Sequence, residues 1–348
     1  MMTLALLPAL TGTALAGYGD VVDGYPSWAE RELHLYTNAA RVDPQAFESD
    51  YNRGGCGFDD FTSDEQTAKP PVYYSPPLND AARFHSTDMR DTGNFSHDSS
   101  DGTSFGQRLS RFYTETSSVG ENIAYGYPDN WAAMMEGWMC SSGHRENIMR
   151  SGWNELGTGV VDNYYTQDFG GGSADSTIGI RMGVHSPQSV AAGQSLAFYA
   201  DWAGSDLTVM ALILDGEVYT MDLLWGEWDS GVFTTSAPMP EGCADYYFVY
   251  EDASGQRAFP EAGAYLMGSS CADTWEVRDE TLSPWPEDNV GGDGPSGGGG
   301  DGGIWVDGEE DTHDVAVKGC ATTPTPGGSG GALALLGMLG LTALTRRR

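Results

Sequence analysis

The chain has 348 residues, of which 50 are acidic and 17 are Lys or Arg, so its formal net charge is −33. The length is sufficient for two ordinary domains with tails, and a hydrophobic content of 40% is enough to bury a sizeable core. A surface this acidic repels nucleic acid and anionic lipid, which excludes both as partners; it suits an extracellular protein, although solubility alone would also explain it.

Residues 1–16 have the pattern of a secretory signal peptide. A short apolar run ends in the small-x-small sequence Ala14-Leu15-Ala16, which predicts cleavage after Ala16. The usual positively charged n-region is missing, and the alternative of a core helix is disfavoured by the Gly-Tyr-Gly-Asp that follows.

Export would permit disulfides among the five cysteines. Grouping them by expected domain pairs Cys56 with Cys140 and Cys243 with Cys271, and it leaves Cys320 alone in the tail. The sequence by itself does not fix this connectivity.

Residues 25–172 alternate helical patterns with short strands, which predicts an α+β domain of helices packed around a small sheet. Ser27 is expected to cap a first helix, and Pro76-Pro77 to begin a second. Further helices are expected over about residues 104–113 and after Asp129-Asn130, and strands over about residues 121–125, 156–161 and 164–169.

Residues 176–278 lose the helical period. Short apolar runs, separated by turn signals such as Asp215-Gly216, occupy residues 196–200, 209–214, 218–221 and 246–250. This spacing predicts an all-β domain, an antiparallel sandwich of immunoglobulin-like size.

The remaining chain divides into an acidic, Gly-rich linker over residues 279–318 and an anchor segment over residues 319–348. The apolar run 332–344 is shorter than the roughly 20 residues of a full membrane span, and Arg346-Arg347-Arg348 marks a cytoplasmic side. The segment resembles bacterial C-terminal sorting tails, and Gly319-Cys320 resembles the myxobacterial type, in which the tail is cut and the cysteine becomes the anchoring end. The alternative is a weak transmembrane helix that stays; both interpretations place the exported protein at the cell surface, or secreted, with membrane contact through this tail only.

Three polar side chains stand in apolar, Gly-punctuated segments of the first domain: His97 in Asn-Phe-Ser-His, Glu121 in Gly-Glu-Asn-Ile-Ala, and His144 in Gly-His-Arg-Glu-Asn. A buried carboxylate is unfavourable unless something pairs with it, and two imidazoles are natural partners. Two His and one Glu are also a minimal divalent-metal site, and the same trio can serve as base and orienter for a water molecule.

Together with Leu-Gly-Thr-Gly at 156–159 and Tyr-Thr-Gln-Asp-Phe at 165–169, these motifs resemble, in order, the short bacterial branch of the CAP superfamily (cysteine-rich secretory protein, antigen 5 and pathogenesis-related 1 proteins). The resemblance covers about residues 27–169. It implies a three-layer α-β-α sandwich with a cleft that holds two His and two Glu, able to bind Zn²⁺ or another divalent cation. His97, Glu121 and His144 fall on three of these positions. The second Glu is replaced by Ser141, three residues after Trp138, which weakens metal binding and any two-carboxylate mechanism.

Other histidines carry less information. His85 lies on the apolar stripe of the second helix, so we expect a core or cleft-wall histidine that could line the cleft with Ser141. His34, His185 and His313 have no partners in motif context, and Arg145 is expected to pair with a carboxylate.

These observations leave three functional hypotheses open. The first is an envelope-anchored extracellular binding or interaction module whose cleft binds a divalent ion or small ligand, with an unknown envelope or extracellular partner. The second is a protease-like hydrolase in which an imidazole activates water while Glu121 orients it. The third is a buried polar network that only holds the fold together.

Overall fold

The computed structural model describes residues 17–51, 56–116, 118–173, 179–268 and 274–277, all within one compact unit that spans Met1–His313. The expected signal peptide, the whole linker and the anchor segment lie outside the described residues, as do Cys271 and Cys320. Among the described residues there is no helix of sufficient length and apolarity to cross a membrane.

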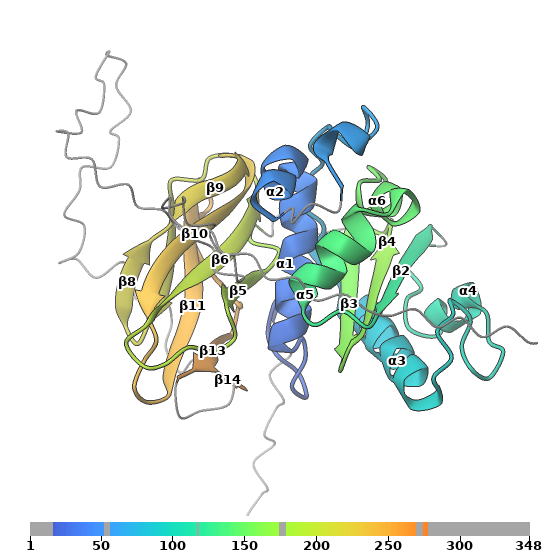
Figure 1. Cartoon of the computed structure of the whole chain (residues 1–348). Coiled ribbons are helices and arrows are strands. Elements are labelled where there is room, and N and C mark those ends of the chain that lie inside the picture. Colours follow the sequence, from blue (N-terminus) through green and yellow to red (C-terminus); the bar gives the residue numbers. More distant parts are fainter. Residues whose placement is uncertain (1–16, 52–55, 117, 174–178, 269–273, 278–348) are drawn as a thin grey trace, which may run out of the picture. The chain divides into compact units, whose positions relative to one another are not determined.

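The first domain is built on a four-stranded sheet in the order β1-β3-β4-β2 (Figure 1). Strand β1 pairs parallel with β3, and the other pairs are antiparallel. The strand bounds are β1 (Tyr73–Tyr74), β2 (Val119–Tyr125), β3 (Glu155–Val161) and β4 (Tyr164–Gly170). The three longer strands match the expected ones, and β2 lies at an edge of the sheet, which leaves one of its sides open to a site.

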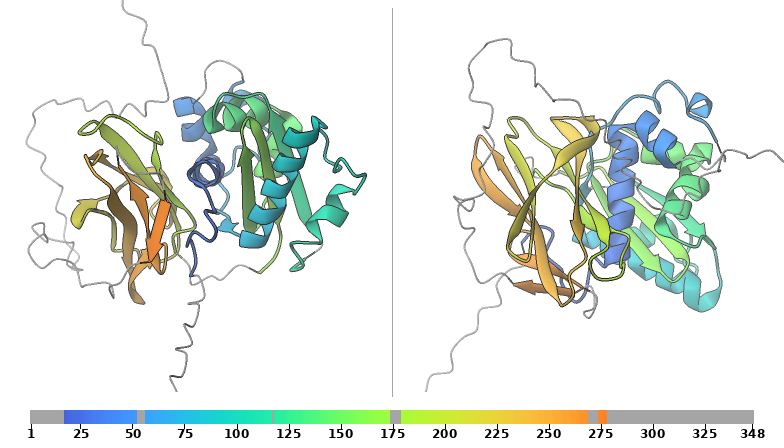
Figure 2. Two further views of the ribbon diagram at one scale, coloured as in Figure 1. Left: turned by 90° about the horizontal axis from the view of Figure 1, so that it is seen from below. Right: turned by 60° about the vertical axis from the view of Figure 1, so that its left-hand side comes forward.

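Helices lie on both faces of this sheet (Figure 2). Successive residues of a strand point to opposite faces. A Cβ at Gly157 or Gly159 would lie within 2.3 Å of the backbone of helix α3, whereas Thr158 between them donates to the Glu30 carbonyl of helix α1. The glycines therefore let α3 approach closely on one face while α1 occupies the other.

The helices begin where the sequence signals place them, with differences in length. Ser27 and Glu30 form the capping box of α1, and Pro76 is the first residue of α3. The helix expected over 104–113 is only five residues long. Four short helices and a π-helical turn complete the set among the described residues. The bounds are α1 (Trp28–Val42), α2 (Pro44–Tyr51), η1 (Phe58–Asp60), α3 (Pro76–Thr92), α4 (Phe105–Leu109), α5 (Asn130–Ala132), η2 (Ala133–Met139, π-helical) and α6 (Ser142–Ile148).

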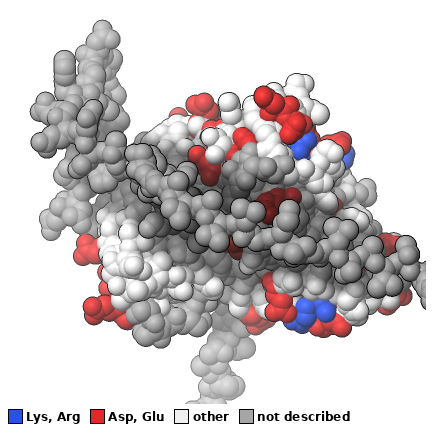
Figure 3. All heavy atoms as spheres, in the orientation of Figure 1, with Lys and Arg blue, Asp and Glu red and all other residues white. Residues whose placement is uncertain are grey.

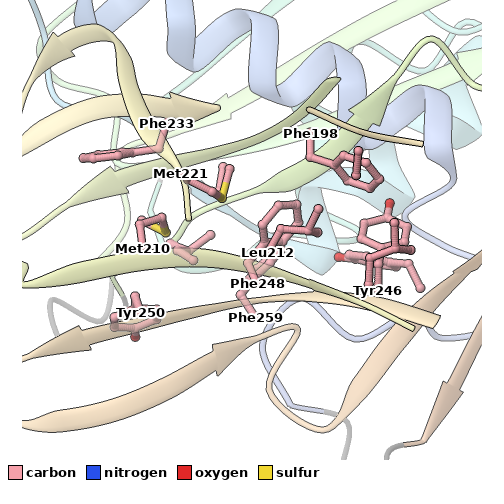
Figure 4. Packing of buried hydrophobic residues seen from close by; sticks show 14 of the residues in the cluster. Phe198, Met210, Leu212, Met221, Phe233, Tyr246, Phe248, Tyr250 and Phe259 are labelled. Atoms are coloured by element: carbon pink, nitrogen blue, oxygen red, sulfur yellow. The ribbon is translucent and has the colours of Figure 1, made fainter. Parts of the chain in front are cut away.

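Two antiparallel sheets form the second half of the described chain. They share a core in which Phe198 and Phe233 of one sheet meet Phe248 and Tyr246 of the other (Figure 4). The immunoglobulin-like topology stays a prediction. One sheet has the order β5 (Gly183–Ser186), β6 (Ser195–Ala203), β10 (Ser230–Pro238), β9 (Asp222–Glu227); the other has β14 (Thr274–Val277), β13 (Gly263–Met267), β11 (Ala244–Asp252), β7 (Val209–Leu214), β8 (Glu217–Thr220), with β12 (Gly255–Phe259) paired to β11.

Helix α1 contacts both the first sheet and strands β5, β6, β9 and β10, so 13 of its 15 residues are buried. Polar bonds fix this contact. Asn38 donates to Asp201 of β6 at 2.5 Å, and Ser186 of β5 donates to Glu32 at 2.7 Å. Helix α1 is therefore a core element of the whole described unit.

The structure bears on two of the disulfide predictions. The disulfide Cys56–Cys140 is confirmed, and it joins residues 84 positions apart. Cys243 is also disulfide-bonded, while its expected partner Cys271 lies outside the described residues. The surface carries many carboxylates and few basic side chains, as the face in Figure 3 shows.

Candidate functional site

The centre of the site is Glu121 on the edge strand β2, whose side chain is 1% exposed. Its Oε1 accepts a hydrogen bond of 2.8 Å from His97 Nδ1, and its Oε2 is in an ion pair with the guanidinium of Arg108. Both carboxylate oxygens are therefore occupied, and the negative charge is neutralised inside the protein.

Arg108 is the residue that sequence reasoning missed. It projects from α4, is fully buried, and also donates to the His97 carbonyl at 2.7 Å. One guanidinium thus neutralises Glu121 and holds the bend that carries His97. We expected two imidazoles to balance Glu121; instead one arginine and one imidazole do so. The signal available in the sequence was only that a buried carboxylate needs a cation.

Asp168 on β4 is a second buried carboxyl at the centre of the site. It lies opposite Glu121 in the β2–β4 register, and a side-chain hydrogen bond with Glu121 is among its contacts. Burial, and then the charge of Glu121, raise the pKa of Asp168 well above its usual range. Arg108 stabilises the charge on Glu121, so Asp168 is the carboxyl that keeps its proton.

His85 lies behind Glu121 and does not line the open part of the site. Its side chain is fully buried on α3, and its Nε2 is 3.9 Å from Glu121 Oε1. Burial lowers the pKa of His85, which keeps its ring neutral.

His144 reaches the site from the first turn of α6. Its Nδ1 is 2.9 Å from the hydroxyl of Ser141, and its carbonyl accepts from Asn122 at 3.2 Å. Asn122 also donates to Gln167 and accepts from Asn147, so this turn is fixed to the sheet. Burial, and then the positive charge of His97, lower the pKa of His144.

A hollow of about 370 Å³ lies over these residues. Most of its lining residues are polar, and it is open to solvent. His85 is absent from its wall, while His97, Glu121, Ser141 and His144 are present. The complete lining is His97, Glu121, Asn122, Ser141, Gly143, His144, Glu146, Asn147 and Arg150.

The two imidazoles of the hollow have different surroundings. The hydrogen bond to Glu121 raises the pKa of His97, whereas burial lowers that of His144. Each ring uses Nδ1 for its partner, so Nε2 is the nitrogen that each has available for a ligand.

These side chains do not fit the Zn²⁺ site implied by the family resemblance. A cation at Glu121 would have to displace Arg108 or His97, and Ser141 supplies no carboxylate. Among the described residues, no group of three or more His, Cys, Asp or Glu side chains is placed to hold a metal ion. Arg145, as expected, is in an ion pair with a carboxylate, Glu65, at 3.1 Å.

Taken together, the fold and the site define a mixed α/β domain with a polar, histidine-lined hollow at a sheet edge. Residues 35–171 match the model of the CAP family, the cysteine-rich secretory protein family. This part of the chain is therefore similar to a CAP domain.

Two curated relatives match parts of this domain. The chain is 42% identical over 96 residues to the uncharacterized membrane protein YlbC of Bacillus subtilis (strain 168), covering 28% of either chain. It is 33% identical over 103 residues to the uncharacterized protein YkwD of the same strain, covering 28% of this chain and 39% of that protein. The chain thus spans less than half the length of either relative.

Solved structures give local matches. An extracellular protein containing a SCP domain from Bacillus anthracis str. Ames is 40% identical, with 29% of this chain and 34% of that chain covered and a TM-score of 0.28. A cysteine-rich secretory protein (SAV1118) from Staphylococcus aureus is 15% identical, with 41% and 40% covered and a TM-score of 0.29.

Proposed function

We propose that the chain is an exported, envelope-anchored binding protein whose CAP hollow binds a small polar ligand. The observation that carries the proposal is the clamp of Glu121 between Arg108 and His97. It fixes one imidazole in place and leaves its Nε2 for the hollow, where a second imidazole and two side-chain amides also stand. Pre-oriented polar groups around a concavity are the usual design of a small-ligand site.

A divalent ion is the weaker version of this proposal. The two Nε2 atoms are available as ligands, whereas the Glu121 charge that would attract a cation is already paired. We expect calorimetric titration with Zn²⁺ to give weak binding that is lost in the double variant H97A/H144A. Tight binding, or binding unchanged in the double variant, would place a metal site elsewhere.

Binding itself is tested by histidine-selective NMR. With ¹⁵N-histidine in the chain, soluble amides, saccharides and peptides are added in turn, and the His97 and His144 signals are followed. A ligand should shift both signals and leave that of buried His34 unchanged. If no compound shifts either ring while the protein stays folded, the hollow is not a binding site.

Hydrolysis is the second candidate, and a specific observation favours it. Glu121 orients His97 in the manner of a carboxylate that positions a general base, and its hydrogen bond raises the pKa of His97. A panel of chromogenic esters and peptides tests this. Activity that falls at least tenfold in E121Q would support it, and no turnover above the buffer rate would remove it.

The location at the envelope is supported by the sequence pattern of the two ends. Residues 1–16 resemble a signal peptide, and residues 319–348 carry the Gly-Cys, apolar and triple-Arg order of a sorting tail. Fractionation of cells that express the full chain should place it in the envelope fraction. Deleting residues 332–348 should release it to the medium; retention after that deletion would refute anchoring by the tail.

A further inference from the structure

The two imidazoles of the hollow are held by different partners, and this fixes which proton each one carries. Glu121 is paired with the permanent cation of Arg108, so it is ionised and can only accept hydrogen bonds. The proton in the 2.8 Å contact with His97 therefore belongs to the imidazole Nδ1. In the neutral ring, Nε2 is then left as a hydrogen-bond acceptor that serves the hollow.

His144 has the opposite arrangement. The Nδ1 contact is the only hydrogen bond that the structure gives the Ser141 hydroxyl among the described residues, and this hydroxyl does not cap helix α6. We take the hydroxyl as the donor of this contact and His144 Nδ1 as its acceptor. The neutral ring then carries its own proton on Nε2, and this N–H is a donor for the hollow. Burial lowers the pKa of His144, which agrees with a neutral ring.

We propose that this pair of tautomers makes the hollow a site for an amide group, whose N–H donates to His97 Nε2 and whose carbonyl oxygen accepts from His144 Nε2. The inference rests on the proposed binding function and names its ligand class. In a trans amide the N–H and the carbonyl oxygen point to opposite sides, so an amide that lies between the two rings offers a donor to the accepting imidazole and an acceptor to the donating one. An ester or a carboxylate has no N–H for His97, so each fills only half of the site.

The charges around the hollow agree with an uncharged ligand. Glu121 is neutralised by Arg108, and the two charged side chains on the outer wall, Glu146 and Arg150, are of opposite sign and both exposed. The amides of Asn122 and Asn147 bond to each other and to the protein, so they support the wall.

Ser141 is accordingly a positioning residue. It stands where the family resemblance implies a second Glu, and a carboxylate there would require a proton on His144 Nδ1 and so reverse the tautomer. The substitution of Glu by Ser in this chain therefore turns the Nε2 of His144 from an acceptor into a donor.

The tautomers are measured directly by ¹⁵N NMR on the full chain labelled with ¹⁵N-histidine, in alkaline buffer where both rings are neutral. We expect the Nδ1–H form at His97 and the Nε2–H form at His144. S141T should preserve the second form and S141A should lose its preference, whereas the matched control S142A, in the adjacent exposed serine, should change nothing. An Nδ1–H form at His144 in the unaltered chain would overturn the proposal, whatever binds.

The ligand class is tested with three probes of one size. N-methylacetamide should shift both histidine signals. Methyl acetate and acetate should bind at least about fivefold more weakly, because the loss of one hydrogen bond changes affinity by roughly that factor. S141A should remove that preference and S141T should keep it. Equal affinity for the three probes would overturn the amide assignment and leave a binding hollow. No shift with any probe would overturn the assignment, and the proposed function fails separately if the wider compound panel also leaves both signals unchanged.

Discussion

Replacing Arg108 by methionine tests the electrostatic core of the site. The substitution keeps an unbranched but shorter side chain and removes its charge, which leaves Glu121, 1% exposed, without its cation. Removal of one partner from a buried ion pair destabilises a protein by about 3–5 kcal/mol, because the remaining charge is neither solvated nor paired. The His97 carbonyl also loses a hydrogen bond of 2.7 Å, which contributes about 1 kcal/mol more. We therefore expect R108M to lower the free energy of unfolding by about 4–6 kcal/mol.

Urea unfolding followed by tryptophan fluorescence measures this loss, and R111M is the matched control. Arg111 is three residues further on, is exposed, and donates to the hydroxyl of Thr103, so its replacement should cost less than about 1 kcal/mol. The double variant R108M/E121Q should recover most of the loss, because the uncompensated charge is gone. If R108M unfolds within about 1 kcal/mol of the unaltered protein, or if the double variant is as unstable as R108M, Glu121 is not held by Arg108.

Three further predictions concern stability. Burial raises the pKa of Asp201 from its ordinary 3.8 to about 6. This group therefore stabilises the fold fully below pH 3.8, and its contribution is lost as the pH rises through about 6. The difference in unfolding free energy between the unaltered chain and D201N should change over this pH range, and a difference independent of pH would contradict the prediction. Removal of the Cys56–Cys140 disulfide by C56S/C140S, which opens a loop of 84 residues, should reduce stability by about 4–5 kcal/mol in denaturant titration, and a loss under about 1 kcal/mol would show that the loop is already restrained in the unfolded chain. G159A should destabilise the fold by about 1–3 kcal/mol, because its Cβ would lie 2.3 Å from the α3 backbone. The control G143A, whose Cβ would have no atom within 4 Å, should melt at the temperature of the unaltered chain. Equal melting temperatures of G159A, G143A and the unaltered chain would refute the close approach of α3 to the sheet.

Short-range sequence patterns predicted many of the helices and strands of the first domain. The cap at Ser27, the prolines at the start of α3 and the strands expected over about residues 156–161 and 164–169 rest on short-range patterns, and the structure follows them within a few residues. The helix expected over 104–113 is shorter than its pattern, and α2 and α6 were not anticipated. The 3.6-residue period is weakly expressed in segments of eight residues or fewer, which explains most of these differences.

The site could be predicted only in part, because its chemistry depends on contacts between distant segments. The family resemblance implied that His97, Glu121 and His144 lie around one cleft, and the hollow does bring them together. The ion pair of Glu121 with Arg108 is not visible, because Arg108 belongs to a short helix with no motif. The neutral carboxyl of Asp168 follows only from the β2–β4 register, in which it stands opposite Glu121.

Helix α1 packs against both halves of the described chain, which the sequence analysis treated as separate domains. A helix that packs on one sheet buries one face, yet 13 of the 15 residues of α1 are buried. The sheet of β5, β6, β10 and β9 covers the face that the first domain alone would leave in water. From the sequence alone, the polar residues Glu32 and Asn38 on that face would be placed in solvent. In the structure, Asn38 bonds to Asp201, and Glu32 bonds to Ser186. A chain that ends at residue 172 would expose these groups without their partners, so we expect it to be less stable than the full chain and prone to association through α1. Sedimentation and denaturant titration of residues 17–172 against residues 17–277 measure both effects, and equal stability of the two would show that the β-sheets add nothing to the core around α1.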